Sequence, residues 1–316
     1  MSIIDTHYSK GNIVSLYLLS FLAIILWGLS YIWSNRLLHL RIPVEYFVFV
    51  RVFVAGLLLY CLNKIMGKNI RIKKKDLPMF LLLAMFEPLI YFICETYGIR
   101  LTESPTYSAL IIASTPIVSV AAGMFIFKEK FSIINMLGIV ICLSGLVMVT
   151  LCAESIGNLF LWGVLLLLIA VFSEVGHASC TKALTSSDYE PQVIVMYQFL
   201  IGSVYLFPLF MIKGMKNFDF GYYMSWQVWS PIICLAILCS GIAFSLWVNT
   251  IKHLGVAKSS IFLSLIPLVT AIADGLLGGQ VLRPMQWLGI CIASFGVIMT
   301  QTELPRPRFI PKRSRI

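Results

Sequence analysis

In this chain of 316 residues, one pattern that includes proline and glycine occurs twice, and the two copies are 151 positions apart. Pro116 corresponds in this way to Pro267, and two glycines recur at the same offset. An apolar composition would produce some chance identities, but it would not readily place one proline and two glycines at matching positions. The other identical pairs are Ser108–Ser259, Ala122–Ala273, Leu137–Leu288, Gly138–Gly289, Ile139–Ile290, Gly145–Gly296 and Met148–Met299. The pattern therefore predicts two structural repeats, each long enough for several helices.

Composition places these repeats in a membrane. Hydrophobic residues make up 59% of the chain and charged residues only 12%, which is typical of a polytopic membrane protein. The net charge of +10 does not indicate a nucleic-acid partner, because the basic residues lie in short segments between apolar runs. The eight cysteines mostly fall inside apolar runs and form no Cys-x-x-Cys pair, so we predict neither a disulfide framework nor a metal site.

Crossing the hydrocarbon region takes about 20 apolar residues. The segment from Ile13 to Trp33 lacks a small-x-small cleavage site, so we interpret it as the first span rather than a signal peptide. The predicted fold is an all-α integral membrane protein with about ten transmembrane helices. The predicted spans are 13–34, 43–63, 78–99, 104–127, 132–151, 159–181, 191–212, 228–249, 256–278 and 284–301.

The distribution of positive charge predicts the orientation. With the N-terminus inside, the inner segments carry 17 Lys and Arg and the outer loops carry 6. This bias favours both termini in the cytoplasm, in the plasma or inner membrane of the cell. Five spans per repeat is an odd number, so the second repeat enters the membrane inverted. The expected organisation is a cytoplasmic tail at 1–12, a first repeat at 13–153, a second repeat at 159–302 and a basic cytoplasmic tail at 303–316.

With its ten predicted spans and a characteristic order of residues along them, the chain resembles the drug/metabolite transporter superfamily, specifically its EamA-type ten-helix carriers. The resemblance covers residues 13–301. Glu129 follows the fourth span, whereas Gln280 occupies the corresponding position of the second repeat, where the family often has an acid. The other residues that carry the resemblance are Trp27-Gly28, Arg51, the run from Tyr97 through Ser108, Pro116, Gly138 and Gly145, and in the second half Ser259, Pro267, Gly289 and Gly296.

The resemblance implies secondary active transport of a small organic metabolite by alternating access, coupled to protons or to exchange. Amino acids and related compounds, or lipophilic drugs, are the implied substrates, and export is the implied direction. The central cavity is implied to be lined by spans 1, 3, 4, 6, 8 and 9. The expected partners are the substrate and the lipid bilayer, with no nucleic acid and no cofactor, for a monomer or homodimer.

Other functions stay open beside this interpretation. A flippase for a lipid-linked substrate is the main alternative, and a passive channel or a lipid-modifying membrane enzyme are further ones. The sequence contains no Gly-x-Ser-x-Gly, P-loop or His-Glu-x-x-His motif. We therefore predict that the protein is not an enzyme.

Ionisable groups inside a span are candidates for function because they are costly to bury without a partner. In the third span, Glu87, Tyr91 and Glu95 are spaced by four and share one helix face. Glu87 lies near mid-depth beside Pro88, where it could exchange a proton or hold a cationic group in the cavity. The alternative is a buried pair with Arg51 that locks two helices together.

Glu174 and His177 lie three apart on one face of the sixth span. A Glu-x-x-His pair is half of a carboxylate di-metal site, but the second half is absent from the sequence, so we predict no metal. A proton relay or substrate contact is the favoured interpretation, and a stabilising Glu–His hydrogen bond is the other. Glu87 and Glu174 are the candidates for coupling.

Arg51 has two possible roles. It could bind a substrate carboxylate through both guanidinium branches, or it could pair structurally with Glu45, Glu87 or Glu95, which is the favoured interpretation.

Aromatic residues and prolines complete the predicted site. Trp27 and Tyr31 share a face of the first span, and Trp247 lies on the eighth; such walls suit planar or cationic substrates. Pro116 and Pro267 are expected in mid-helix, as flexible points where one repeat rocks against the other. Glu129 is assigned a structural role.

Overall fold

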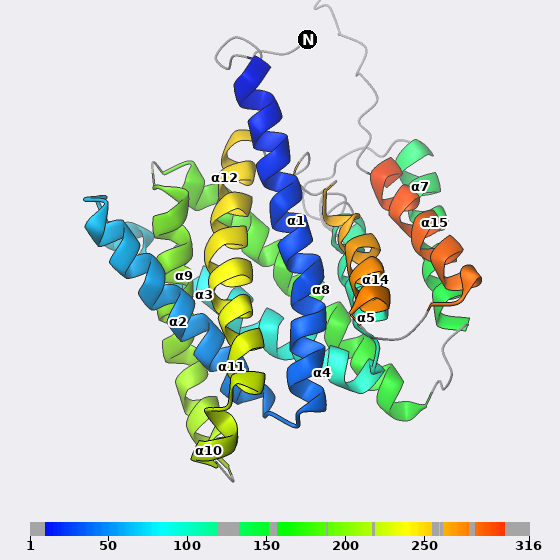
Figure 1. Ribbon diagram of the computed structural model, residues 1–316. Helices are drawn as coiled ribbons and strands as arrows, with labels where there is room; N and C mark the ends of the chain where they lie inside the picture. Colours follow the sequence, from blue (N-terminus) through cyan, green and yellow to red (C-terminus); the bar gives the residue numbers. More distant parts are fainter. Residues whose placement is uncertain are drawn as a thin grey trace, which may run out of the picture.

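A computed structural model describes residues 10–118, 133–151, 157–187, 189–216, 219–254, 259, 262–277 and 282–300. These residues form a bundle of helices (Figure 1). Six segments are long and apolar enough to cross a membrane: Val14–His39, Val44–Ile65, Lys74–Thr102, Asn158–Thr185, Pro191–Gly214 and Trp226–Leu254. Four shorter apolar helices are Pro105–Val118, Ile134–Val149, Ile266–Leu276 and Pro284–Met299. Each of these ten segments overlaps one predicted span, and the all-α membrane fold is confirmed.

The first repeat begins with α1 (Lys10–His39), which is followed by α2 (Val44–Ile65). Its third span has three parts: α3 (Leu77–Ala84), a π-helical turn (Met85–Ile90) and α4 (Tyr91–Thr102). Its last elements are α5 (Pro105–Ile112) and α7 (Ile133–Leu151). Helix α5 begins at a proline, whose missing N–H is harmless there, and the Ser104 hydroxyl accepts from Tyr107 N at 3.2 Å.

The second repeat begins with α8 (Asn158–Thr185) and α9 (Pro191–Leu209), which continues as a π-helical turn (Phe210–Gly214). The short α10 (Phe220–Tyr223) leads into the eighth span, made of α11 (Trp226–Ile233), a π-helical segment (Cys234–Ala243) and α12 (Phe244–Leu254). Helices α14 (Ile266–Leu276) and α15 (Pro284–Thr300) follow.

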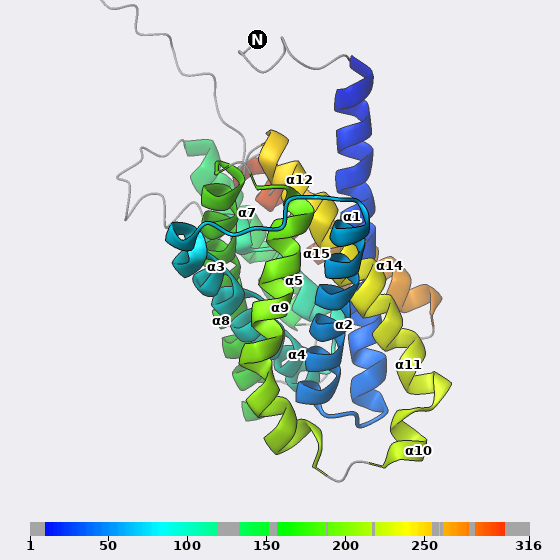
Figure 2. The ribbon, with the colours of Figure 1, turned by 90° about the vertical axis from the view of Figure 1, so that its left-hand side faces the viewer.

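The helix contacts follow the two-fold relation between inverted repeats. Helix α2 packs on α9, α5 on α14, and α7 on α15, so each of these helices touches its own counterpart (Figures 1 and 2). The contact between α4 and α8 has its equivalent in the contact of the eighth span with α1. Equivalent contacts of this kind are expected when two similar units face each other across an axis in the membrane plane.

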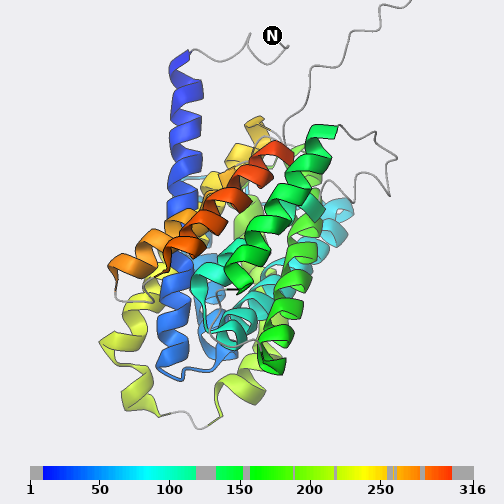
Figure 3. The ribbon, with the colours of Figure 1, turned by 90° about the vertical axis from the view of Figure 1, so that its right-hand side faces the viewer.

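The recurring glycines lie where α7 crosses α15, the pair seen face-on in Figure 3. A Cβ atom added to Gly145 would lie 2.5 Å from both Ala293 N and Gly289 O. A Cβ on Gly289 would in turn lie 3.0 Å from Gly145 O, and one on Gly296 would meet the backbone of Cys142. Glycine recurs at these positions because backbone meets backbone there, as in other tight membrane helix pairs.

We expect Gly145→Ala to destabilise the protein by about 1–3 kcal/mol, because the new methyl group must push two backbones apart. Gly275→Ala in α14 is the matched control, since nothing lies within 4 Å of its added Cβ. Thermal unfolding of the purified proteins should show a lower Tm for the first variant and an unchanged or higher Tm for the second. An unchanged Tm for Gly145→Ala would mean that α7 and α15 pack less closely than described.

The two prolines are not in mid-helix, which corrects the expectation from sequence. Helix α5 ends at Ile112 and a turn at 113–114 precedes the helical segment that contains Pro116. In the same way a turn at 264–265 precedes α14, in which Pro267 is the second residue. Each proline therefore occupies the first turn of a half-helix, where its missing N–H leaves no bond unmade.

Candidate functional site

A cavity lies between the two repeats. Its lining comes from spans 1, 3, 4, 6, 8 and 9, as the resemblance implies, and in addition from Arg51 of α2. The lining residues are Trp27, Ser30, Tyr31, Arg51, Glu87, Tyr91, Phe92, Glu95, Ile112, Thr115, Glu174, Phe244, Leu263 and Ile266.

The helix breaks of the two repeats meet at this cavity. Ile112 and Thr115 flank the first break and Leu263 and Ile266 flank the second, and all four line the cavity. These residues are related by the same offset of 151 positions as the prolines. Discontinuous helices at the interface between repeats are the usual construction of a transporter binding site.

Glu87 reaches the cavity because the third span is interrupted at this residue. Its backbone is extended (φ −142°, ψ 122°) inside an otherwise helical segment, and Pro88 follows. The second repeat supports this irregular turn: Ser173 Oγ donates to Phe86 O at 2.6 Å. Gly176 allows the Phe86 ring to approach, since a Cβ there would lie 2.7 Å from it. Irregular backbone at membrane depth is tolerated when it is buried in this way.

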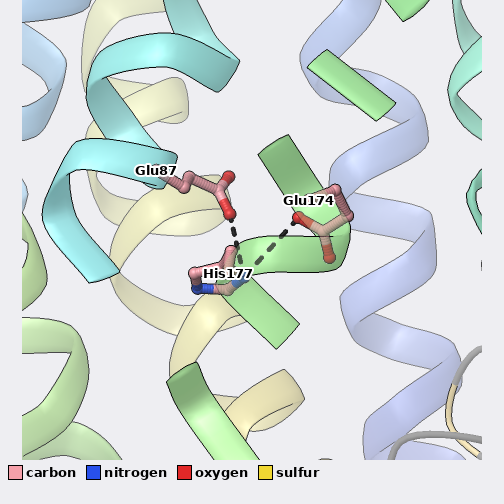
Figure 4. A group of neighbouring side chains, drawn as sticks. All are labelled: Glu87, Glu174 and His177. Carbon is pink, nitrogen blue, oxygen red and sulfur yellow. Dashed lines mark ion pairs between the residues drawn. The ribbon is translucent and has the colours of Figure 1, made fainter. Parts of the chain in front are cut away.

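Glu87, Glu174 and His177 form one cluster, although the sequence offered them as two separate groups (Figure 4). His177 Nδ1 lies 3.2 Å from Glu87 Oε2 and 3.5 Å from Glu174 Oε2. Glu87 and His177 are almost completely buried, whereas Glu174 retains 12% of its side-chain exposure. Glu87 belongs to the first repeat and the other two to the second, so this triad bridges the repeats.

Residues that the sequence did not single out hold the imidazole in place. His177 Nε2 lies 3.3 Å from Gln198 Oε1 of α9 and 3.4 Å from Thr181 Oγ1 of α8. These two contacts hold the ring with Nδ1 toward the two carboxylates. One ligand atom from each triad member lies within 4.8 Å of the others, which is close enough for a single cation or a shared proton.

Tyrosines surround the third carboxylate of the cavity. Tyr91 donates its hydroxyl to Glu95 Oε1 at 3.0 Å, as their spacing of four residues predicts. The Tyr31 hydroxyl is buried at the cavity beside Tyr91 and Glu95.

Arg51 forms none of the ion pairs that the sequence favoured. Its Nε donates to Ser240 Oγ at 2.7 Å, and its guanidinium carbon lies 4.0 Å from the centroid of the Phe92 ring. In the described part of the chain, no carboxylate oxygen lies within the 4.0 Å ion-pair limit of this side chain. Glu45, one expected partner, accepts instead from Tyr97 at 2.7 Å.

The aromatic wall differs in part from the prediction. Trp27 and Tyr31 line the cavity, and so do Phe92 and Phe244, which the sequence did not single out. Trp247 is buried behind this surface, with its ring 5.2 Å from that of Trp27. Trp27 is fixed from behind, because its Nε1 donates to Cys239 O at 3.3 Å. Glu129 lies outside the described residues, so its structural role stays a prediction.

A helical membrane protein with two inverted repeats around a central cavity falls in the class of repeat-built transporters. The chain belongs to the EamA-like transporter family, which it matches over residues 14–151 and 161–302.

Relatives that are named as transporters match most of the chain. The chain is 23% identical to the uncharacterized transporter YetK of Bacillus subtilis (strain 168), with 88% of this chain and 84% of YetK covered. It is 22% identical to an uncharacterized transporter of Archaeoglobus fulgidus, with 88% and 96% covered. A solved crystal structure that is 14% identical to this chain matches it with a TM-score of 0.68. The match covers 90% of this chain and 96% of the other, which shows a shared fold. The protein is thus a multi-pass membrane transporter for a small molecule.

Proposed function

We propose that this protein is a secondary active exporter of small organic metabolites, amino acids or related compounds, that works by alternating access. The observation that carries the proposal is the triad Glu87–His177–Glu174. It borders the substrate cavity through its two glutamates and joins the two repeats. A change of its charge therefore acts at the same time on the ligand site and on the attraction between the moving parts.

Protons are the proposed coupling ion, with Glu87 and Glu174 as the carriers. The Glu87 carboxylate and the His177 imidazole lie 3.2 Å apart, which is within reach for proton transfer. The other charged groups at the cavity are Glu95 and Arg51. When a proton arrives, the triad loses negative charge, so the balance of attraction between the repeats changes with it.

Transport by reconstituted protein tests this function. Amino acids and related metabolites that raise the Tm of the purified protein would be added, radiolabelled, to proteoliposomes. We expect saturable counterflow and accumulation when a pH gradient is imposed. Linear, non-saturable flux would indicate a channel, and absence of both flux and counterflow for the whole panel would refute the proposal.

We further propose that both termini lie in the cytoplasm, on the basis of the charge bias. In a background without the native cysteines, Lys74→Cys and Gly157→Cys both place a thiol at an exposed position. An impermeant thiol reagent should label Gly157→Cys in intact cells and Lys74→Cys only after lysis. The opposite pattern of labelling would reverse the orientation.

A further inference from the structure

The cavity contains one cation whose hydrogen-bonding capacity is largely unused. Arg51 is 2% exposed and lines the cavity, and its guanidinium commits only Nε, to Ser240. Among the residues that the structure describes, its two terminal nitrogens make no hydrogen bond to protein. A buried guanidinium stays charged, so it needs an anion or several acceptors close by.

The nearby acids already have partners of their own. Glu87 lies against His177, Glu95 accepts from Tyr91, and Glu45 accepts from Tyr97 and lies 3.9 Å from Lys213 Nζ. Glu87, Glu95 and Glu174, the three acids that line the cavity, form no hydrogen bond to the terminal nitrogens of Arg51 in the described part of the chain. Those nitrogens are left to the contents of the cavity.

Two contacts hold the guanidinium in a fixed orientation. Ser240, from the π-helical segment of the second repeat, accepts from Nε, and the Phe92 ring of the first repeat packs against the guanidinium. A planar guanidinium held in one orientation presents its N–H donors as a fork, and such a fork can bind a carboxylate through two parallel hydrogen bonds. Because its supports come from both repeats, the fork would be rearranged when the repeats move.

The negative groups of the cavity lie at two depths. Arg51 follows the start of α2 at Val44 by seven residues, roughly 10 Å along the helix axis. Glu87 is near the middle of the segment Lys74–Thr102 and forms its triad there with residues of α8. Glu95 lies seven residues before the end of α4 at Thr102, and this helix end adjoins the start of α2, since Tyr97 donates to Glu45. The cavity therefore has Arg51 and Glu95 toward one end and the triad of Figure 4 at mid-depth.

We propose that Arg51 binds the carboxylate of the transported substrate, which is a carboxylate-bearing zwitterion with its ammonium group toward the triad and its apolar part against Trp27 and Phe244. This inference rests on the proposed transport function and adds to it the residue that selects the substrate. It replaces the structural role that the sequence favoured for Arg51.

Matched pairs of ligands test this assignment. Each amino acid that raises the Tm of the purified wild type is compared with its own amide, which keeps the ammonium and the side chain but lacks the negative charge. We expect the wild type to prefer the acid by at least about tenfold in Kd, because the fork loses a charged acceptor with the amide. Arg51→Gln should remove the preference, and Arg51→Lys should retain part of it.

Two further measurements keep the outcome decisive. Arg100→Gln, an exposed arginine in α4, is the control and should keep the wild-type preference. If Arg51→Gln does not fold, the ratio for Arg51→Lys decides, because a purely structural arginine would leave that ratio at the wild-type value. Equal binding of acid and amide by the wild type, or no binding of any acid in the panel, overturns the assignment. Counterflow of the amides with the same half-saturating concentration as the acids would do so while leaving the transport function intact.

Discussion

Glu87→Gln is expected to abolish accumulation driven by a pH gradient, while binding and exchange of substrate survive in part. The amide has the shape of the acid but cannot take up or release a proton. Glu87 is 2% exposed and lies 3.2 Å from His177 Nδ1, so the substitution removes the negative charge that this imidazole faces. Proteoliposomes containing the variant should equilibrate a labelled substrate and accumulate it no further.

Glu95→Gln is the matched control for this experiment. Glu95 lines the same cavity on the same span, but its hydrogen bond comes from Tyr91. We expect the control to retain accumulation, and we expect Glu174→Gln to weaken it, because Glu174 lies 3.5 Å from His177. Accumulation at the wild-type level by Glu87→Gln would exclude this residue as the coupling site. Loss of folding would make the pair with His177 structural.

Much of the architecture follows from simple periodicity. Ten apolar segments and an odd number of spans per repeat are sufficient to predict an inverted duplication, because the bilayer requires a minimum helix length. The offset of 151 positions also predicts which positions are equivalent, and the two helix breaks obey it. The number of spans and the equivalence of the repeats depend on local composition and on the thickness of the bilayer, so they can be predicted from the sequence.

The contacts inside the site depend on packing, and here prediction was less complete. Glu87 and His177 are 90 positions apart, and they meet because Gly176 and Ser173 receive the interrupted turn around Phe86. The predicted spans 78–99 and 159–181 put Glu87 nine residues and His177 four residues from the inner end, so depth alone did not pair them. The partner of Arg51 was predicted wrongly, because charge alone favoured an acid, whereas the structure provides Ser240 and the Phe92 ring.

The helix breaks themselves lead to the second large expected effect. At the first break the Thr115 hydroxyl donates to Ile112 O at 2.6 Å and the Ser114 hydroxyl donates to Ile111 O at 2.6 Å. These hydroxyl groups bind the carbonyls at the end of α5. A continuous helix would instead use the N–H of residue 116 for Ile112 O, and proline has no such hydrogen.

Replacement of both Pro116 and Pro267 by alanine is therefore expected to lower turnover by about tenfold and to leave the Tm unchanged or higher. Alanine supplies the missing N–H and removes the ring that clashes with the carbonyl four residues earlier, so each span can close into one stiff helix across the cavity. Pro105→Ala is the control, since Pro105 is the first residue of α5 at a span end, where Ser104 caps the helix. Counterflow rates and the substrate Kd should be measured together, because stiffening slows exchange between the two states while the Kd changes little. A wild-type rate in the double variant would mean that the turns at 113–114 and 264–265 persist without proline, and that the prolines serve only in packing.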